Sequence, residues 1–187
     1  MANSLFRSRD RVSNGPVRRW LIVACATCWG IFQVVALCDD HVSGNFTAKG
    51  KSVELHHVYA FWRSRATDES KFDMYVLLSD QVIAPDSLPA NDSAIAKMAE
   101  LVRADKIHAF ELHFDGTTKR LFEGEQGAVY HNGIAMARQG VTGMLQYRPD
   151  RSEASAVAGS VSVDKDFVDT LGWTCSASFQ VAIPAKP

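Results

Sequence analysis

The chain has 187 residues, of which 47% are hydrophobic, 22% charged and 10% aromatic, and its formal net charge is −1. These values are typical of a globular domain, and they exclude a collagen-like chain, a disordered tail and a polytopic membrane protein. The length is sufficient to bury a core without disulfide or metal staples.

The first 38 residues have the order of an export signal. Five arginines lie among residues 1–19, and residues 20–37 carry no charge. A basic region followed by an apolar run is typical of a signal peptide, and Ala36 and Cys38 provide the small residues that precede a cleavage site. The alternative is an uncleaved membrane anchor, because about 18 apolar residues can cross a bilayer while the arginines stay in the cytoplasm.

Both interpretations export residues 39–187, which we expect to form one domain in the periplasm or outside the cell. This domain contacts a membrane only through residues 20–38, and only if they are not cleaved. Without residues 1–38, 15 Lys and Arg stand against 20 Asp and Glu, a net charge of −5. This balance argues against a nucleic-acid partner, because neutralising phosphates requires a basic surface.

Alternating hydrophobicity and turn signals predict that the exported domain is mainly β. The expected strands are residues 45–48, 51–62, 72–79, 107–114, 117–123, 129–134, 141–147, 156–163 and 173–183. Asp115-Gly116 and Asn132-Gly133 predict hairpin turns, because these pairs accept the positive φ of a type I′ turn. Cys175 falls on the apolar face of its strand, so we expect a buried and inert thiol.

One helix is predicted near residues 92–105. Asn91 or Asp92 can cap it, and Ile95, Met98 and Val102 recur at helical spacing. We expect it to cover a sheet edge or an open end. Short strands at regular spacing with one inserted helix predict an antiparallel β-sandwich of immunoglobulin-like or related topology, with a small closed β-barrel as the alternative.

Three segments carry a resemblance to known sequences. Residues 44–61 contain a His-x-Tyr-Ala-Phe strand, residues 76–80 read Val-Leu-Leu-Ser-Asp, and residues 159–179 close the set. Together they resemble a loose set of uncharacterised exported bacterial β-sandwich proteins. The resemblance implies a small exported β domain, and it carries no established activity and no catalytic residue.

The best candidates for chemistry are two matching segments, Glu54-Leu55-His56 and Glu111-Leu112-His113. Alternation turns each leucine inward and places the Glu and His of each segment on the outer face of the sheet. If the two strands were neighbours, the four side chains could bind zinc or copper(II). The competing interpretation is that these residues belong to the wet face of an antiparallel sheet.

Two further histidines and the apolar stretch around Trp62 are candidates for either a structural or a binding role. We expect His108 to be buried and hydrogen-bonded, and His131, which precedes the Asn-Gly turn, to be exposed. Alternation along residues 51–62 puts Trp62 on an apolar part of the outer face. Either the predicted helix or a loop covers this part, or Trp62 with Arg63 and Arg65 forms a binding surface.

No catalytic motif occurs, since the sequence contains no Gly-x-Ser-x-Gly, no phosphate-binding loop and no His-Glu-x-x-His. We therefore expect a non-catalytic binding or assembly module of the cell envelope, with an envelope protein or a ligand as partner. A metal-binding periplasmic protein using the two Glu-x-His pairs is the alternative, and a hydrolase comes third.

Overall fold

A computed structural model of the chain describes residues 40–133, 137–150 and 155–187. The predicted export segment and its cleavage site lie outside these residues. In the part that is described, no helix is long and apolar enough to span a bilayer.

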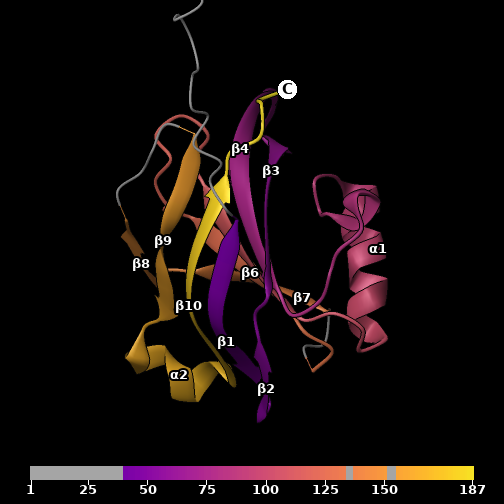
Figure 1. The fold of residues 1–187 in the computed structure, drawn as a ribbon, viewed down its shortest axis with the longest axis vertical. Coiled ribbons are helices and arrows are strands. Elements are labelled where there is room, and N and C mark those ends of the chain that lie inside the picture. Colours follow the sequence, from indigo (N-terminus) through magenta and orange to yellow (C-terminus); the bar gives the residue numbers. More distant parts are fainter. Residues whose placement is uncertain (1–39, 134–136, 151–154) are drawn as a thin grey trace, which may run out of the picture. The chain divides into compact units, whose positions relative to one another are not determined.

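Two antiparallel sheets of five strands each make up the described part of the chain (Figure 1). Sheet A has the order β2-β1-β10-β9-β8 and consists of β1 (His41–Ala48), β2 (Lys51–Glu54), β8 (Leu145–Pro149), β9 (Ala156–Val163) and β10 (Trp173–Ala182). Sheet B has the order β3-β4-β5-β6-β7 and consists of β3 (His57–Arg65), β4 (Asp68–Ser79), β5 (Ala109–Phe114), β6 (Glu125–Tyr130) and β7 (Arg138–Thr142). The prediction of a mainly antiparallel β protein with two sheets is confirmed, and the closed barrel is wrong.

The main core lies between the two sheets, and β10 shows why the sequence folds this way. Its residues alternate between buried and more exposed positions, and every second side chain from Trp173 to Val181 joins the core. Burying one face of a strand fixes its register, because a slip of one residue would expose the whole apolar set. Cys175 is a free buried thiol, as expected, and burial raises its pKa to about 12.

The predicted helix is present as α1 (Asp92–Arg103), and Asn91 caps it by accepting a hydrogen bond from the backbone N–H of Ala94 at 3.0 Å. The buried side chains of α1 pack against the outer face of sheet B in a second hydrophobic cluster (Figure 1). The helix therefore covers a sheet face, and the expectation that it covers an edge or an open end is wrong.

Two short helices are additional to the predicted elements. A 3-10 helix, η1 (Pro85–Ser87), precedes α1, and α2 (Lys165–Leu171) connects β9 to β10. The Asp164 side chain accepts a hydrogen bond from the backbone N–H of Asp166 at 3.1 Å, and Gly172 ends the helix with a φ of 67°. A Gly in the left-handed region is a common helix terminator, so this signal was readable in the sequence.

The stretch 51–62, expected as one strand, is divided between the two sheets. β2 ends at Glu54, and after Leu55 and His56 the chain enters β3 of sheet B. The alternation restarts there, so that Val58, Ala60 and Trp62 face the main core while Tyr59 and Phe61 face α1. The predicted faces of residues 57–62 are therefore wrong.

Two further connections differ from the expected turns. Residues 141–147 are divided between β7 and β8 at Gly143, which has a φ of 68°. A loop longer than two residues joins β5 to β6, because the Asp115 carboxylate accepts hydrogen bonds from the backbone N–H groups of Thr117 and Thr118 at 3.0 and 2.7 Å. This local turn replaces the two-residue hairpin predicted from Asp115-Gly116.

Candidate functional site

Glu111 is the centre of a buried polar network on the outer face of sheet B. Its side chain is completely buried. One carboxylate oxygen accepts hydrogen bonds from Arg63 Nη2 at 2.8 Å and from Tyr130 Oη at 3.1 Å, and the other accepts from Arg63 Nη1 and Arg138 Nη2, both at 3.4 Å. Burial opposes the charge of Arg63, but Glu111 outweighs this effect and raises the pKa of the guanidinium. Both carboxylate oxygens are thus saturated by donors.

An aromatic stack extends this network along the same face. The Arg63 guanidinium lies 4.0 Å from the ring centre of Tyr75, the Tyr75 ring stacks on His113 at 4.4 Å, and His113 stacks on Phe122 at 4.3 Å. The two ring nitrogens of His113 lie 3.1 Å from Asp73 Oδ2 and 2.9 Å from the carbonyl oxygen of Glu125. Burial raises the pKa of the Tyr75 hydroxyl to about 12. The His113 ring therefore has an aromatic neighbour on each stacking contact and a polar partner at each of its two nitrogens.

Arg63 and Arg65, which the sequence offers as part of a binding surface, are engaged in ion pairs. Arg63 binds Glu111, and Arg65 Nη2 lies 2.6 Å from Asp73 Oδ1 and 2.7 Å from Asp115 Oδ2. Burial works against ionisation of Asp73, but the hydrogen bond from Arg65 prevails and the pKa of the carboxyl is lowered. Both arginines connect β3 to other parts of sheet B through these ion pairs. Their role in the described structure is to stabilise the fold.

The two Glu-x-His pairs lie in different parts of the fold. Glu54 ends β2 at the edge of sheet A, and its exposed carboxylate is 3.7 Å from His56 Nε2. Glu111 and His113 lie on β5, whose neighbours are β4 and β6 in sheet B, and both are buried. The two pairs are therefore not neighbours, which was the condition for a shared metal site, and the wet-face interpretation is wrong for β5. In residues 40–133, 137–150 and 155–187, no three His, Cys, Asp or Glu side chains form a group that could hold a metal ion.

Trp62, the third member of the predicted binding surface, lies on the inner side of β3 and packs against the main core. Its Nε1 donates a hydrogen bond to the carbonyl oxygen of Pro184 at 2.9 Å, which ties the C-terminal segment to sheet B. Two lysines, Lys119 and Lys186, lie over the same ring. Trp62 thus belongs to the rim of the sandwich interior, and its predicted place on the outer face is wrong.

Near this rim, the space between the sheets opens into a cavity of about 770 Å³. It lies where β10 ends and β9 begins, since Ala182 pairs with Ala156 at this end of sheet A. Most of the apolar lining comes from β8 and β9 of sheet A, and the loop after β5 completes it with one apolar and three polar residues. The lining consists of Thr118, Lys119, Arg120, Leu121, Leu145, Tyr147, Pro149, Ala156, Val157, Ala158 and Ile183.

Tyr147 separates this cavity from the rest of the core. Its ring packs edge-on against Phe114 of sheet B at 5.2 Å and stacks on Phe179 at 6.2 Å, and its hydroxyl donates to the carbonyl oxygen of Ala158 at 2.9 Å. Burial raises the pKa of the Tyr147 hydroxyl to about 12. The ring lies over Gly159, where a Cβ atom would meet it at 2.6 Å. The glycine therefore allows the position of the tyrosine that forms the cavity floor.

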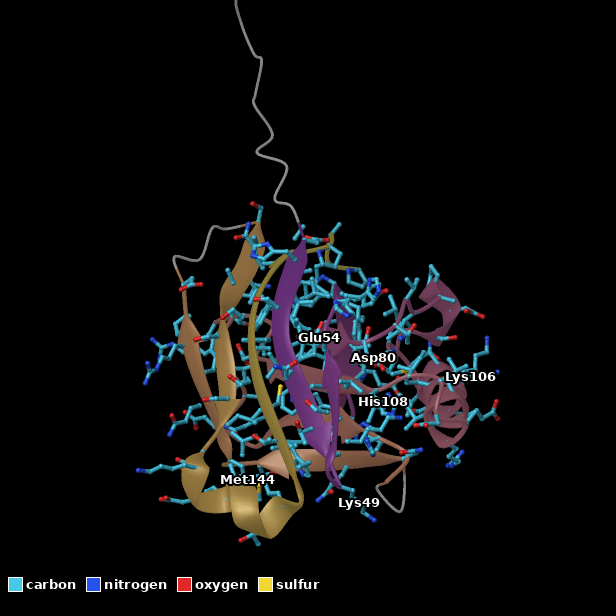
Figure 2. The ribbon with its side chains drawn as sticks, turned by 60° about the horizontal axis from the view of Figure 1, so that its bottom comes forward. Lys49, Glu54, Asp80, Lys106, His108 and Met144 are labelled. Carbon is cyan, nitrogen blue, oxygen red and sulfur yellow. The ribbon has the colours of Figure 1, made fainter. Side chains whose placement is uncertain are left out.

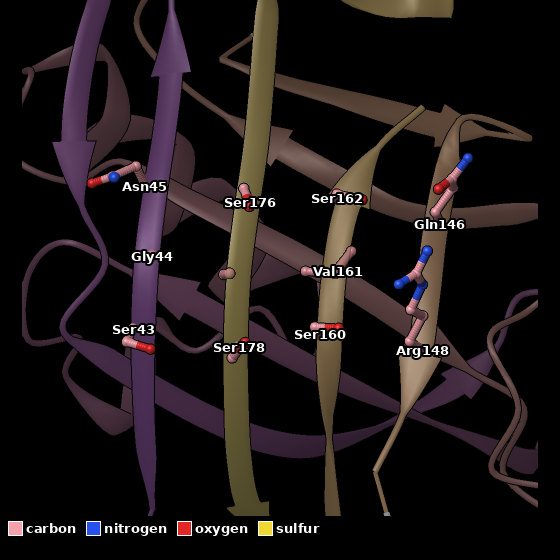
Figure 3. Close-up of a pocket in the computed structure, with 11 residues that line it drawn as sticks. Ser43, Gly44, Asn45, Gln146, Arg148, Ser160, Val161, Ser162, Ser176 and Ser178 are labelled. Carbon is pink, nitrogen blue, oxygen red and sulfur yellow. The ribbon is translucent and has the colours of Figure 1, made fainter. Parts of the chain in front are cut away.

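A second hollow, of about 480 Å³, lies on the outer face of sheet A (Figure 3). Two rows of polar residues cross the four strands there. The rows are Asn45, Ser176, Ser162 and Gln146, and Ser43, Ser178, Ser160 and Arg148. Polar pairs directly opposite each other stabilise neighbouring strands, so the sheet itself accounts for this face and no ligand is needed to explain it.

A histidine pair lies on the other side of the domain, near the end of α1. His108 is buried, as expected, and its ring nitrogens lie 2.9 Å from Asp80 Oδ2 and 2.8 Å from Asp105 Oδ1 (Figure 2). His131 packs against it at 4.8 Å and is only 3% exposed, so the expectation of an exposed His131 is wrong. His131 Nδ1 accepts a hydrogen bond from the backbone N–H of Gly133, and its Nε2 has no partner in the described structure. Burial, and then the charge of His108, lower the pKa of His131.

Among these features, the cavity is the one that sequence reasoning missed. No local pattern marks it, because it depends on how the loop after β5 packs across sheet A. The only available signal was the pair Lys119-Arg120 next to apolar Leu121, which places charge beside an apolar surface. Comparison of the chain with protein-family models, with curated proteins and with solved structures finds no match.

Proposed function

We propose that the domain is a binding module that holds a small apolar or amphipathic molecule in the cavity between sheet A and the loop after β5. The observation that carries this proposal is the size and lining of the cavity, about 770 Å³ with apolar side chains from sheet A and from Leu121 in the loop after β5. Ligand pockets in proteins range over about 300–1,000 Å³ and combine an apolar lining with a few polar groups. Each buried methylene of a ligand contributes about 0.8 kcal/mol, so an alkyl chain fits the chemistry of this lining.

The N-terminal sequence supports an exported setting for this activity. A basic region and an apolar run precede Asp39, which is the pattern of a signal peptide or an anchor. We infer that the domain acts in the periplasm or outside the cell. We also infer that its sandwich is related to the immunoglobulin arrangement without reproducing it, because neighbours within sheet B follow one another along the chain as a meander.

Metal binding remains the alternative from another class, and the geometry gives it less support. The pairs Glu54/His56 and Glu111/His113 lie in separate sheets, and the Glu111 carboxylate is saturated by Arg63, Arg138 and Tyr130. A zinc or copper(II) ion at Glu111 would have to displace an arginine from a buried carboxylate. Equilibrium dialysis of the wild type and of the His56→Ala and His113→Ala variants against zinc or copper(II) tests this alternative by comparing the amount of bound ion.

The cavity proposal is tested by filling the cavity. Ile183 is partly buried at the cavity wall, next to the C-terminal segment, and Ile183→Trp would occupy the space. We expect displacement of the fluorescent probe ANS by dodecanol to weaken by about tenfold or more, which is the loss of two buried methylenes. Val82→Trp is the matched control, since Val82 is 72% exposed and outside the lining.

Equal dodecanol binding by the wild type, Ile183→Trp and Val82→Trp would show that the alcohol does not use this cavity. No dodecanol binding by the wild-type protein would also reject the proposal.

A further inference from the structure

Two lysines share one aromatic ring at the cavity rim. Lys119 Nζ lies 4.1 Å from the ring centre of Trp62, and Lys186 Nζ lies 5.5 Å from the same centre. The hydrogen bond from Trp62 Nε1 to Pro184 keeps the ring in place and brings the C-terminal segment that carries Lys186 beside the loop that carries Lys119. Two like charges therefore contact the same ring, next to a cavity whose lining includes Lys119.

Neither lysine has a carboxylate partner among the described residues. Lys51, Lys71 and Lys97 each form an ion pair with an aspartate at 2.9 Å, whereas Lys119 and Lys186 form none. Burial, and then the charge of Lys186, lower the pKa of Lys119. Bringing two cations together without an anion costs free energy, which an added anion would recover.

The acidic residue nearest to Lys119 in the loop is already engaged. Asp115 Oδ2 binds Arg65 at 2.7 Å, and Asp115 Oδ1 accepts hydrogen bonds from the N–H groups of Thr117 and Thr118. These hydrogen bonds to its ionised form outweigh partial burial and lower the pKa of the Asp115 carboxyl. Asp115 thus shapes the loop; its charge raises the pKa of Lys119, but burial and Lys186 outweigh it, and the two residues form no ion pair in the described structure.

The loop also fixes the position of Lys119. The backbone N–H of Lys119 donates to the carbonyl oxygen of Asp115 at 2.9 Å, and the residue has a φ of 58°. A non-glycine residue in the left-handed region is strained and persists where the surroundings hold it. The ammonium is therefore presented at the rim by a constrained turn.

We infer that the ligand of the proposed cavity is a single-chain amphipathic anion, with its alkyl chain among the apolar lining residues and its carboxylate between Lys119 and Lys186. This inference rests on the proposed function, because the chain needs the cavity. It adds the class of the head group, which follows from charge complementarity with two cations that form no ion pair with residues 40–133, 137–150 or 155–187. The predicted net charge of residues 39–187 is −5, so a site with two positive charges differs from the domain as a whole.

The test uses three probes with the same alkyl chain and different heads: laurate, dodecanol and dodecyltrimethylammonium, each below its micelle concentration. For the purified full chain we expect laurate to bind about tenfold more tightly than dodecanol and the cationic probe to bind most weakly. Added salt should reduce the advantage of laurate and leave dodecanol unchanged, because screening acts on the charge interaction alone.

Variants of the lysine pair separate the head-group site from the cavity. In the double variant Lys119→Asn, Lys186→Gln, laurate should lose its advantage over dodecanol; Asn is chosen because it tolerates a positive φ. In Lys119→Glu, Lys186→Glu, the cationic probe should bind more tightly than laurate. Lys106→Gln is the matched control, since Lys106 is an exposed lysine near α1 that is not part of the lining (Figure 2). Thermal unfolding of each variant verifies that the fold is retained.

The outcomes distinguish the two proposals. If Ile183→Trp weakens laurate and dodecanol while the lysine variants leave their ratio unchanged, the cavity stands and the anion site is rejected. If no single-chain probe binds the wild type, both are rejected. Binding of laurate only when it is part of a vesicle would also overturn the inference, because it would assign the lysines to a membrane surface.

Discussion

The substitution Glu111→Gln tests whether the buried network on sheet B holds the fold together. The change keeps the shape of the side chain and removes the negative charge that faces Arg63 and Arg138, whose side chains are 13% and 25% exposed. Breaking a buried ion pair by removing one partner costs about 3–5 kcal/mol, because the other charge remains buried. With an m-value of about 2 kcal/mol/M in urea, the unfolding midpoint should fall by about 2 M.

Urea unfolding followed by tryptophan fluorescence measures this shift, and Glu123→Gln is the matched control. Glu123 is exposed, and its side chain forms no hydrogen bond or ion pair in the described structure, so its substitution should change stability by less than about 0.5 kcal/mol. If both variants unfold at the same urea concentration, Arg63 and Arg138 find other partners or water, and the central role given to Glu111 is refuted.

Three more predictions concern single sites. The folded-state pKa of His131 is lowered below its ordinary value of 6.5, so its contribution to stability is complete above that pH and is lost as the pH falls. Between about pH 8 and pH 5, the melting temperature should therefore drop less in His131→Gln than in the wild type. Parallel curves of melting temperature against pH would contradict this. Gly159→Ala should destabilise the domain by about 1–3 kcal/mol in urea, because the new Cβ would lie 2.5 Å from the carbonyl oxygen of Arg148 and 2.6 Å from the Tyr147 ring; an unchanged midpoint would show that strand and ring move without cost. Cys175 should resist iodoacetamide in the native protein and react in urea, as read by peptide mass spectrometry, whereas modification of the folded protein would show an accessible thiol.

The strands that could be predicted are those with one buried and one wet face. β9 and β10 have small polar residues such as Ser160 and Ser178 on the outer face of sheet A, so their alternation is visible in the sequence. α1 was predictable for the same reason, since its apolar residues recur on one side and Asn91 caps it. In these elements the burial pattern and the local signals agree, which is the condition under which periodicity identifies structure.

β3 shows why residues 57–62 were assigned to the wrong faces. The strand is apolar on both sides, because Val58 and Ala60 face the core between the sheets while Tyr59 and Phe61 face α1. When both faces of a strand are buried, polar and apolar residues do not alternate, so the sequence does not show which face points to the core and which to α1. At Leu55 and His56 the chain passes from sheet A to sheet B, and the alternation of inward and outward side chains shifts by one residue. No local sequence signal marks this shift.

Glu111 and His113 show the limit for candidate sites. In the sequence they look like residues of a solvated face, and only contacts distant in the chain change that interpretation: Arg63 is 48 residues from Glu111, and Asp73 is 40 residues from His113. The sequence marks Glu111 and His113 as polar and chemically capable, but their partners and their burial depend on tertiary structure. Interactions of this range cannot be assigned without knowing which strands are neighbours.

The position of the cavity suggests how stability and binding can be separated in this domain. The core on one side of Tyr147 is filled by large aromatic rings that contact one another, including Phe46 with Phe110 at 6.4 Å and Phe110 with Trp173 at 5.8 Å. On the other side the lining includes the first residues of β9, a turn and the C-terminal segment. Strand ends and turns accept substitutions that a packed core does not. Changes at Lys119, Lys186 and Ile183 should therefore alter which molecule binds while the aromatic core preserves the fold, and this makes ligand specificity testable apart from folding.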